Sequence, residues 1–574
     1  MDRIWLKSYP PEVPAEVDAT QLRSLTELLE KACSEHADRV AYVQMDTELT
    51  YRRLDELTRA FGAWLQKAGF SKGDRIAIML PNTLQYPIAM FGALRAGLIV
   101  VNTNPLYTAP ELEHQLADSG ATAIVVLENF AHVLQKVIAH TSVKRVLVTA
   151  AGDFLAFPKS LIVNFVVRQV RKQVPPWSIA DALSFKAAVA EGLKLPLAPV
   201  EVGPDDLAFL QYTGGTTGVA KGAMLSHGNV SINVLQAEAC LGRRSHDNGV
   251  LITAIPLYHI FALTANCLVF ARLGWKNVLI INPRDLPAFI RDMKKYPCNF
   301  ISGVNTLFNA LLHAPGFDQV DFSHLEITLG GGMAVQASVA QRWKEVTGNV
   351  LTQAWGLTET SPAACINPLD EPFNGSIGVP IPSTEVAVKD DAGNDLPLGQ
   401  IGELCVRGPQ VMRGYWNRPD ETALVMLPGG WLRTGDVGRM DQRGFVYIED
   451  RKKDMILVSG FNVYPNEVEE VAVNCPGILE AAAVAQPDER SGEVVALFVV
   501  RKDPALTDEQ VIDCCRKSLA GYKVPRHVYF RDDLPKSNVG KILRKSLRDE
   551  LKRVSPIHSG VATRQPAPAK QSGR

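Results

Sequence analysis

The sequence predicts an α/β protein: a large N-terminal domain of layered α/β subdomains with a β-rich subdomain, followed by a small α+β domain. Three observations support this fold class. Short β-branched apolar segments alternate with amphipathic helical segments over the first part of the chain. Glycine, proline and aspartate become frequent after about residue 375. A chain of 574 residues also exceeds what one hydrophobic core usually contains.

The first helical segments lie near the N-terminus, where their start and stop signals are local. Ser24 and Glu27 have the spacing of a capping box, and apolar residues follow at helical spacing over 25–32. The same spacing recurs over 54–65, and Gly69 follows as a typical stop signal. We therefore expect two amphipathic helices here.

Short apolar segments separate such helices. They are rich in β-branched residues and bounded by turn residues, which is typical of strands buried in a mostly parallel sheet. The segments are 75–80, 122–127, 145–150, 207–212, 251–255 and 278–281.

The later part of the chain is expected to be partly antiparallel, with strands at 401–407 and 445–448. A dense charged run, 450–454 (DRKKD), is a candidate hinge. Beyond it we expect helices at 465–474 and 507–519 and strands at 481–485 and 494–501. These patterns divide the chain into an N-terminal domain (1–449), a small C-terminal domain (450–554) and a tail (555–574) whose composition predicts disorder.

Composition argues against several classes of protein. A formal net charge of -1 gives no support to a nucleic-acid-binding protein. The nine cysteines show neither C-x-x-C nor zinc-ligand spacing, so we expect reduced, mostly buried thiols in a cytosolic protein. The N-terminus has no apolar signal region, and Arg95 interrupts the longest apolar run, 88–101. We expect a protein that is soluble or attached to a membrane only at its surface.

A glycine-rich segment at 212–222 (YTGGTTGVAKG) carries the strongest local signal. It follows a predicted strand; its glycines let the backbone approach an anion, and its hydroxyls and lysine favour phosphate. It is not a Walker A loop, because Ala220 precedes the lysine and Gly222 follows it. The candidate phosphate-binding residues are Tyr212, Thr213, Gly214, Gly215, Thr216, Thr217, Gly218 and Lys221.

This loop resembles the signature of the adenylate-forming superfamily, which includes acyl-CoA ligases, luciferases and the adenylation domains of peptide synthetases. Further segments resemble motifs of this family in the expected order. They are 256–261 (PLYHIF), 330–334 (GGGMA), 353–360 (QAWGLTET), 434–436 (TGD), 450–453 (DRKK) and 535–541 (PKSNVGK). The resemblance implies the adenylate-forming enzyme fold, with residues 1–449 binding AMP and the acyl group and 450–554 acting as a mobile lid.

The resemblance also implies the cofactors ATP, Mg²⁺ and coenzyme A. Lys541 would bridge the substrate carboxylate and the α-phosphate, and His259 would lie beside the acyl carboxylate. Glu359 would hold Mg²⁺, and Thr213 would assist it. Nucleotide contacts are expected from Gly332, Gln353, Trp355, Gly356, Thr358, Asp436 and Arg451.

One position in this set departs from the usual family residue. Trp355 stands where the family usually has tyrosine; its indole keeps a face for adenine stacking but lacks the phenol hydroxyl. For the thiol half-reaction, the resemblance places Lys453 at the hinge and Ser459 with Gly460 along the pantetheine path, where a side chain at Gly460 would obstruct CoA.

The segment 450–470 is similar to the fatty-acyl-CoA synthetase signature. The expected function is therefore a long-chain fatty-acid–CoA ligase, which forms acyl-AMP with release of pyrophosphate and then acyl-CoA with release of AMP. The alternatives are a medium-chain or aryl acid–CoA ligase of the same superfamily and a non-catalytic acyl-nucleotide binding protein. A peptide-synthetase module is disfavoured because no carrier-like segment follows Lys541. The preferred chain length, the pathway and the oligomeric state, including a homodimer, are left open.

The segment 154–180 is expected to form a basic amphipathic helix. It contains Lys159, Arg168, Arg171 and Lys172, no acidic residue, and valines at helical spacing from 163 to 174. Such a helix can lie on an anionic bilayer, which would place the protein peripherally on the inner face of the cell membrane. It can equally pack on the protein's own core.

Overall fold

The computed structural model describes residues 3–213, 219–246, 248–488, 490–537 and 539–554. The chain forms two compact units. The first comprises Met1–Lys453 with Asn538–Lys541, and the second comprises Asp454–Ser537 with Ile542–Arg574. The predicted tail, 555–574, lies outside the described residues.

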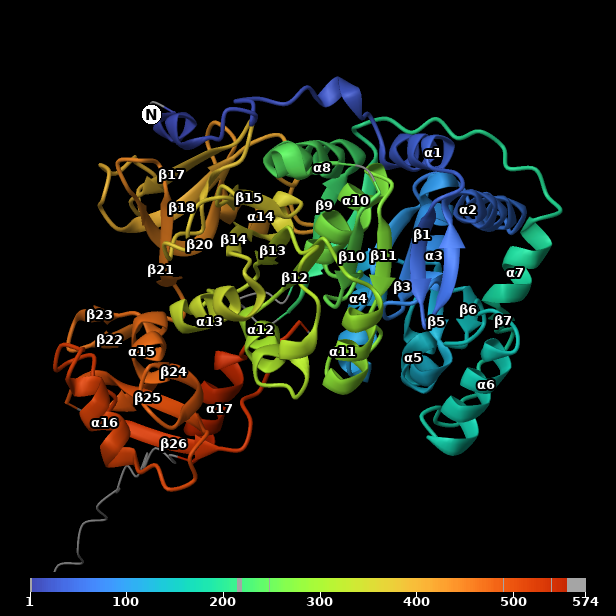
Figure 1. The fold of residues 1–574 in the computed structure, drawn as a ribbon. Coiled ribbons are helices and arrows are strands. Elements are labelled where there is room, and N and C mark those ends of the chain that lie inside the picture. Colours follow the sequence, from blue (N-terminus) through green and yellow to red (C-terminus); the bar gives the residue numbers. More distant parts are fainter. Residues whose placement is uncertain (1–2, 214–218, 247, 489, 538, 555–574) are drawn as a thin grey trace, which may run out of the picture. The chain divides into compact units, whose positions relative to one another are not determined.

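The first unit contains a seven-stranded sheet in the order β7-β6-β5-β3-β4-β8-β9 (Figure 1). Its strands are β3 (Arg75–Met79), β4 (Ile99–Asn102), β5 (Ala123–Leu127), β6 (Arg145–Thr149), β7 (Leu183–Ser184), β8 (Leu207–Thr213) and β9 (Lys221–Ser226). All neighbours are parallel except the β8–β9 hairpin. The predicted buried strands of this part are confirmed.

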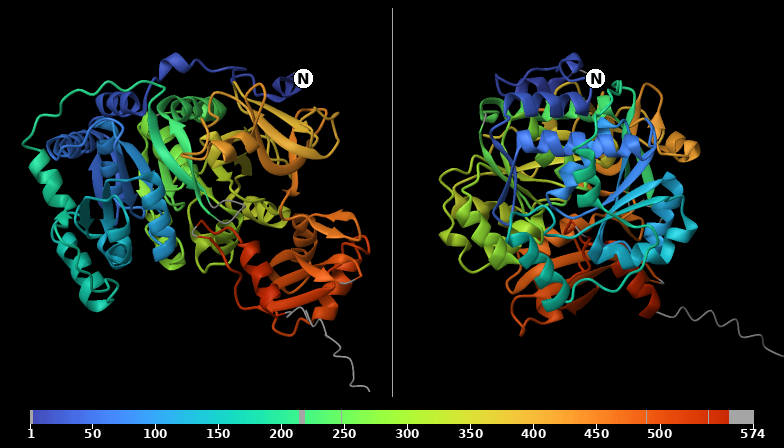
Figure 2. Two further views of the ribbon diagram at one scale, coloured as in Figure 1. Left: turned by 180° about the vertical axis from the view of Figure 1, so that it is seen from behind. Right: turned by 90° about the vertical axis from the view of Figure 1, so that its right-hand side faces the viewer.

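Helices cover both faces of this sheet (Figures 1 and 2). One face packs on α2 (Tyr51–Lys67), α3 (Gln85–Arg95) and α7 (Phe185–Gly192), and the other on α4 (Ala109–Ser119) and α5 (Ala131–Val137). Helix α3 is buried on all sides, which explains why the sequence around it is apolar without a polar stripe.

The two predicted N-terminal helices are confirmed, although the capping box predicted at Ser24 and Glu27 forms only in part. Helix α1 (Leu25–Glu35) begins at Ser24, whose hydroxyl accepts a hydrogen bond from the Glu27 backbone N–H. The Glu27 carboxylate in turn accepts from the Arg23 backbone N–H at 2.9 Å. Helix α2 is followed by Gly69, whose φ of 90° suits glycine.

A nine-stranded sheet forms the second layer, in the order β16-β15-β14-β13-β12-β10-β11-β1-β2. Its strands are β1 (Val40–Gln44), β2 (Thr47–Thr50), β10 (Val250–Thr253), β11 (Lys276–Leu279), β12 (Phe300–Gly303), β13 (Ile327–Gly330), β14 (Leu351–Gly356), β15 (Ala363–Ile366) and β16 (Val379–Pro380). Helix α8 (His227–Leu241) packs on one face, and α11 (Leu286–Lys295), α12 (Asn305–Leu312) and α13 (Ala337–Thr347) pack on the other.

The β-rich part that follows is antiparallel, as predicted. It consists of β17 (Glu385–Lys389), β18 (Gly402–Arg407), β19 (Met426–Leu427), β20 (Trp431–Met440) and β21 (Val446–Arg451). Helix α14 (Pro419–Val425) precedes β19.

The second unit is a small α+β fold. Its sheet contains β22 (Ile456–Val458), β23 (Phe461–Val463), β24 (Ile478–Asp488), β25 (Gly492–Arg501) and β26 (His527–Arg531). Helices α15 (Pro465–Val473), α16 (Asp508–Arg516) and α17 (Arg544–Val554) pack on it. The helices and strands predicted at 465–474, 481–485, 494–501 and 507–519 are confirmed.

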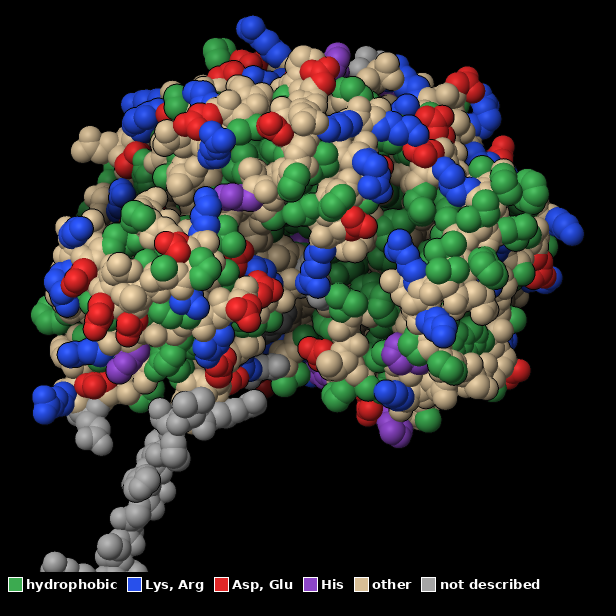
Figure 3. Space-filling view, turned by 60° about the horizontal axis from the view of Figure 1, so that its bottom comes forward, with side chains coloured by type: hydrophobic (Ala, Val, Ile, Leu, Met, Phe, Trp, Pro, Cys, Tyr) green, Lys and Arg blue, Asp and Glu red, His purple; other side chains and the backbone are tan. Residues whose placement is uncertain are grey.

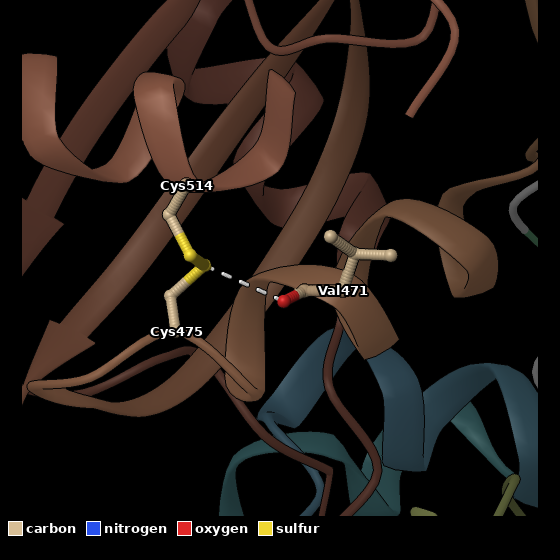
Figure 4. The surroundings of a disulfide bond; sticks show 3 residues. All are labelled: Val471, Cys475 and Cys514. Carbon is tan, nitrogen blue, oxygen red and sulfur yellow. Dashed lines mark hydrogen bonds between the residues drawn. A yellow bond between two sulfur atoms is a disulfide. The ribbon is translucent and has the colours of Figure 1, made fainter. Parts of the chain in front are cut away.

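The cysteines differ from the expectation of uniformly reduced thiols. Cys475, just after α15, and Cys514 in α16 form a disulfide, with Cα atoms 6.1 Å apart (Figure 4). The Cys475 Sγ also lies 3.5 Å from the carbonyl oxygen of Val471. The two cysteines are 39 residues apart in sequence, so only the packing of α15 against α16 brings them together. The other seven are free.

No helix within the described ranges is both long and apolar enough to cross a membrane.

Candidate active site

The predicted phosphate loop connects the paired strands β8 and β9, in which Thr213 lies opposite Lys221. Gly214, Gly215, Thr216, Thr217 and Gly218 lie outside the described residues. At the start of the loop, the Tyr212 hydroxyl donates to the carboxylate of Asp118 at 2.6 Å. Burial, and then the hydrogen bond to Asp118, raise the pKa of Tyr212 well above its usual value. The hydroxyl is therefore a fixed donor that holds the end of β8.

The segment 416–418 contacts the same β8–β9 hairpin. Arg418 forms an ion pair with Asp118 at 2.6 Å, and the Trp416 backbone N–H donates to the Gly222 carbonyl at 2.8 Å. The Trp416 indole also donates to the Asp118 carbonyl. Asp118 thus joins the phosphate loop to the 416–418 segment, a link the sequence did not reveal.

The loop's lysine has a partner of its own. The Lys221 ammonium lies 2.5 Å from a carboxylate oxygen of Glu421 in α14 and 5.3 Å from the centre of the Tyr415 ring. Both partners place its charge at the C-terminal end of the loop, where a phosphate would compete with Glu421 for it.

Glu359 lies in the short 3₁₀ turn Thr358–Thr360 that follows β14. Its carboxylate accepts a hydrogen bond from the Tyr415 hydroxyl at 2.7 Å, and its carbonyl accepts from the Met412 N–H at 2.8 Å. Burial and then Glu359 raise the pKa of Tyr415 well above its usual range. The carboxylate of Glu359 is therefore oriented by a neutral donor.

Glu359 fits the role of a magnesium ligand. Among the described residues no group of three or more His, Cys, Asp or Glu side chains is placed to hold a metal ion. Mg²⁺ commonly binds one or two carboxylates and completes its coordination with phosphate oxygens and water. A single oriented carboxylate beside the predicted phosphate loop is consistent with this mode of Mg²⁺ binding. Thr213, the other predicted magnesium residue, lies at the end of β8.

Asp436 lies at the centre of a buried hydrogen-bond group in β20. One carboxylate oxygen accepts from the Trp355 indole N–H at 2.9 Å, and the other is 2.7 Å from the Arg451 guanidinium. Arg451 faces Asp436 across the β20–β21 pair, and the Thr434 hydroxyl accepts from the Asp436 backbone N–H. The Asp436 side chain is only 2% exposed. Trp355 therefore has a polar role that the sequence prediction, limited to stacking, did not include.

Gln353, Gly356 and Gly332 are also predicted to contact the nucleotide. The Gln353 amide oxygen accepts from the Val335 N–H at 3.1 Å, and its amide nitrogen donates to the Ser376 carbonyl at 2.9 Å. Gly356 admits no side chain, because an added Cβ would lie 1.7 Å from the Pro362 carbonyl oxygen. Gly332 has a φ of 79°, and a Cβ there would lie 3.1 Å from the Cε of Lys541.

His259 precedes helix α9 (Ile260–Ala262), and its Nδ1 accepts from the Phe261 N–H at 3.3 Å. Desolvation, with a contribution from the nearby Lys541 cation, lowers the pKa of His259 to about 3. A histidine this acidic is neutral at physiological pH, so it can accept or donate a hydrogen bond without adding a charge.

Lys541 belongs to the first unit, although it is separated from that unit's main segment by residues Asp454–Ser537 of the second unit. The Thr306 hydroxyl donates to the carbonyl of the adjacent Gly540 at 2.9 Å. Desolvation and the Arg451 cation lower the pKa of Lys541 to about 8, while Asp436 and Glu359 oppose that shift. The structure therefore gathers Lys541, Glu359, Asp436, Arg451 and His259 within electrostatic reach of one another.

The residues predicted for the thiol half-reaction lie elsewhere. Ser459 and Gly460 form the exposed turn between β22 and β23 in the second unit, with φ angles of 50° and 85°. The Ser459 N–H donates to the Ser491 carbonyl at 2.8 Å. No atom lies within 4 Å of a Cβ built on Gly460. Lys453 is the last residue of the first unit's main segment.

Family models match both parts of the chain. The AMP-binding enzyme model matches residues 29–416, and the model of the AMP-binding enzyme C-terminal domain matches residues 467–541.

Similar proteins align over nearly the whole chain. A long-chain-fatty-acid–CoA ligase of Escherichia coli O6:H1 is 55% identical over 553 residues, covering 96% of this chain and 98% of that protein. One of Haemophilus influenzae is 51% identical, covering 97% and 100%. One of Bacillus subtilis is 38% identical, covering 95% and 98%.

Solved structures share the fold. The anthranilate CoA ligase AuaEII in complex with anthranoyl-AMP aligns with a TM-score of 0.84 at 24% identity, covering 94% of this chain and 99% of that one. ATP-bound MatB from Rhodopseudomonas palustris aligns with a TM-score of 0.80 at 27% identity, covering 92% and 99%. The predicted fold class is confirmed by these alignments.

Proposed function

The chain belongs to the AMP-binding enzyme family, and from this premise we infer that it is a long-chain fatty-acid–CoA ligase. The observation that carries this conclusion is the identity of 51–55% over nearly the full length of ligases of that name. It is an acid–thiol ligase whose substrates are a fatty acid, ATP and CoA. The resemblance noted in the sequence is thereby confirmed.

In the first half-reaction, a carboxylate oxygen of the fatty acid attacks the α-phosphorus of ATP, and pyrophosphate leaves. Two anions must approach, so the site has to supply positive charge and fixed positions. We assign the bridging cation to Lys541, and we assign Mg²⁺ binding to Glu359 with Thr213. The ion, when bound, neutralises phosphate charge. Lys221 and the 214–218 loop are proposed to hold the remaining phosphate oxygens.

The nucleoside is proposed to lie against Trp355, between Gln353 and Asp436. Asp436 would accept hydrogen bonds from the ribose hydroxyls, and its orientation by Trp355 and Arg451 supports this role. The backbone at Gly332 and Gly356 allows close approach, and Thr358 is proposed as a phosphate contact. His259, neutral at physiological pH, would donate a hydrogen bond from Nε2 to the acyl carboxylate, since its Nδ1 accepts from the Phe261 N–H.

In the second half-reaction the CoA sulfur attacks the acyl carbon and AMP leaves. We propose that residues 450–554 form a mobile lid hinged near Lys453, and that Ser459 and Gly460 line the pantetheine path. The open space around the Gly460 Cα supports the last assignment. A bulky side chain there would meet CoA before it met the rest of this turn.

We also propose that the enzyme works in the cytoplasm and contacts the inner face of the cell membrane through residues 154–180. Long acyl chains partition into bilayers, so the substrate is concentrated there. The exposed apolar side chains of this segment support the proposal.

The decisive experiment is a rate profile over fatty acids of increasing length, with benzoate and other aryl acids as competitors. Acyl-AMP is trapped with hydroxylamine, and acyl-CoA is measured separately. A long-chain ligase should show a maximum kcat/KM with long-chain substrates. A maximum at medium-chain or aryl acids would replace the proposed substrate, and failure to form acyl-AMP from any acid would leave only a binding protein.

A further inference from the structure

The segment 256–259 leads from β10 of the nine-stranded sheet to His259. Its start is held by Asn82, which follows β3 of the seven-stranded sheet. The Asn82 amide nitrogen donates to the Ile255 carbonyl at 3.1 Å, and its amide oxygen accepts from the Leu257 N–H at 2.8 Å. A side chain from beside one sheet therefore fixes the backbone that follows the other.

The end of the same segment is held by Gln211 in β8. The Gln211 amide nitrogen donates to the Tyr258 carbonyl at 2.7 Å. This carbonyl belongs to the same peptide group as the His259 N–H, which donates to the Pro256 carbonyl at 2.9 Å. The imidazole is fixed as well, because its Nδ1 accepts from the Phe261 N–H. His259 is thus held at both polar atoms of its peptide group and at one ring nitrogen, and Nε2 is the nitrogen assigned to the acyl carboxylate.

Gln211 is itself oriented by two further side chains. Asn102 lies beside it in the parallel β4–β8 pair, and the Asn102 amide nitrogen donates to the Gln211 amide oxygen at 3.0 Å. The Tyr86 hydroxyl in α3 donates to the Asn102 amide oxygen at 2.8 Å. Burial raises the pKa of Tyr86 well above its usual value, so the hydroxyl keeps the proton that it donates. Each amide accepts from one neighbour and donates to the next, which fixes both orientations.

These four residues, Tyr86, Asn102, Gln211 and Tyr258, form what we call the Gln211 network, and it is buried. Cationic and anionic side chains are mixed over the face of the molecule seen in Figure 3, where water can solvate them. The residues of the Gln211 network are instead at most 8% exposed. Water cannot readily replace a lost partner there, so loss of the Gln211 amide would leave the Tyr258 carbonyl without its donor.

We propose that Gln211 is a positioning residue for adenylation, which orients His259 and thereby places the acyl carboxylate relative to the strand that leads into the predicted phosphate loop. The inference rests on the proposed function and adds a residue to its machinery. Gln211 directly precedes Tyr212, and its amide bonds to the peptide group of His259, so one side chain joins the two substrate sites. Misplacement of a reacting group by about 1 Å can cost on the order of 10²-fold in rate.

The test measures acyl-AMP formation from oleate by pyrophosphate release, and ATP affinity in the absence of fatty acid. Gln211→Met keeps the length of the side chain and removes its hydrogen bonds. It should lower kcat/KM for oleate about tenfold and leave ATP affinity within about twofold of the wild type. In a His259→Ala background the same replacement should cost less than about twofold, because both changes would remove the same contact.

Gln211→Glu provides a rescue that depends on pH. A protonated carboxyl at this position could donate to the Tyr258 carbonyl and accept from Asn102, as the amide does, whereas a carboxylate could not donate. Burial raises the pKa of such a carboxyl, so kcat/KM for oleate, relative to the wild type at each pH, should recover below about pH 6. His259 has a pKa of about 3 and stays neutral over this range. This variant also decides the question if Gln211→Met does not fold.

Gln236→Met is the matched control. Gln236 is also buried in the first unit, and its amide nitrogen donates to the Pro382 carbonyl at 2.8 Å. This replacement should lower the melting temperature and leave kcat/KM for oleate within about twofold of the wild type.

Three results would overturn the proposal. They are an equal loss from Gln211→Met with and without His259, a loss of ATP affinity as large as the loss for oleate, and no recovery of Gln211→Glu at low pH. A wild type that forms acyl-AMP while all Gln211 variants match it would refute only the positioning role. A wild type that forms no acyl-AMP would refute the proposed function, and this inference with it.

Discussion

Replacement of Trp355 by phenylalanine should impair the use of ATP through Asp436. The indole N–H donates to one carboxylate oxygen of Asp436 at 2.9 Å, while Arg451 holds the other. Phenylalanine keeps an aromatic face for the adenine but removes the donor. Asp436 would then be oriented from one side only, so its hydrogen bonds to the ribose would weaken.

The expected size follows from the nature of the bond. A hydrogen bond to a charged group contributes about 1.5–3 kcal/mol, and Asp436 is buried, so the lost bond is not replaced readily by water. Arg451 remains, which favours the lower part of that range. A loss of about 1.5–2 kcal/mol corresponds to a fall of roughly 10- to 30-fold in kcat/KM for ATP.

The assay compares kcat/KM for ATP, 2′-deoxy-ATP and 3′-deoxy-ATP at saturating fatty acid. If Trp355 acts through the ribose hydroxyls, the defect of Trp355→Phe should shrink when either hydroxyl is missing. The double variant Trp355→Phe/Asp436→Asn should be little worse than Asp436→Asn alone, because both changes break the same interaction.

Trp343→Phe provides a matched control. Trp343 is also buried, and its indole donates to the Thr328 hydroxyl at 3.0 Å in a core that does not include Asp436. It should lower the melting temperature without changing the preference for ATP over its deoxy analogues. An equal defect of Trp355→Phe with all three nucleotides would show that the indole acts only by stacking or packing, and the positioning role would be abandoned.

Three further predictions concern the proposed machinery. Lys541→Ala should reduce acyl-AMP formation about 10²- to 10³-fold while sparing CoA transfer from supplied acyl-AMP, and an equal loss in both steps would contradict a role in adenylation alone. Because its pKa is about 8 and only the ammonium can bridge two anions, adenylation by the free enzyme should decline as pH rises through about 8. Lys541→Arg should move this decline to higher pH. An unchanged pH profile would show that another group causes the decline. Gly460→Leu should allow pyrophosphate release but stop acyl-CoA formation. Gly460→Asn is the control, because asparagine tolerates a positive φ, and it should retain more turnover. Equal losses of turnover in both variants, with lowered melting temperatures, would indicate backbone strain instead.

Local sequence patterns predicted much of the secondary structure, because helix caps, periodicity and turn residues act over a few positions. Ser24 starts α1, Gly69 follows α2, and the apolar segments at 122–127 and 145–150 form neighbouring parallel strands. Pairing between distant segments was not predictable in this way. Strand β1 joins the nine-stranded sheet beside β11, more than two hundred residues later, and no local signal specifies that neighbour.

The candidate site shows the same limit. Motif resemblance predicted Tyr212, Glu359 and Asp436 as site residues, but it did not predict the groups that orient them. Asp118 and Tyr415 belong to no recognised motif, and they meet their partners 94 and 56 residues away in sequence. A hydrogen bond between such residues depends on the assembled sheets. The sequence alone therefore indicates which chemistry is present, and the structure indicates how each group is held.

The candidate groups differ in whether they are already oriented before a nucleotide binds. Glu359 is fixed by Tyr415, and Asp436 by Trp355 and Arg451, so the groups assigned to magnesium and ribose are oriented by neighbours within the first unit. Orientation in advance reduces what the nucleotide must organise when it binds. Lys221 differs, because its ammonium is paired with the Glu421 carboxylate, which a phosphate oxygen would have to displace. The proposed ribose end of the site is thus preorganised, whereas Lys221 of the predicted phosphate loop must exchange a partner. ATP binding should therefore depend more steeply on salt and on Glu421 than adenosine or AMP binding does.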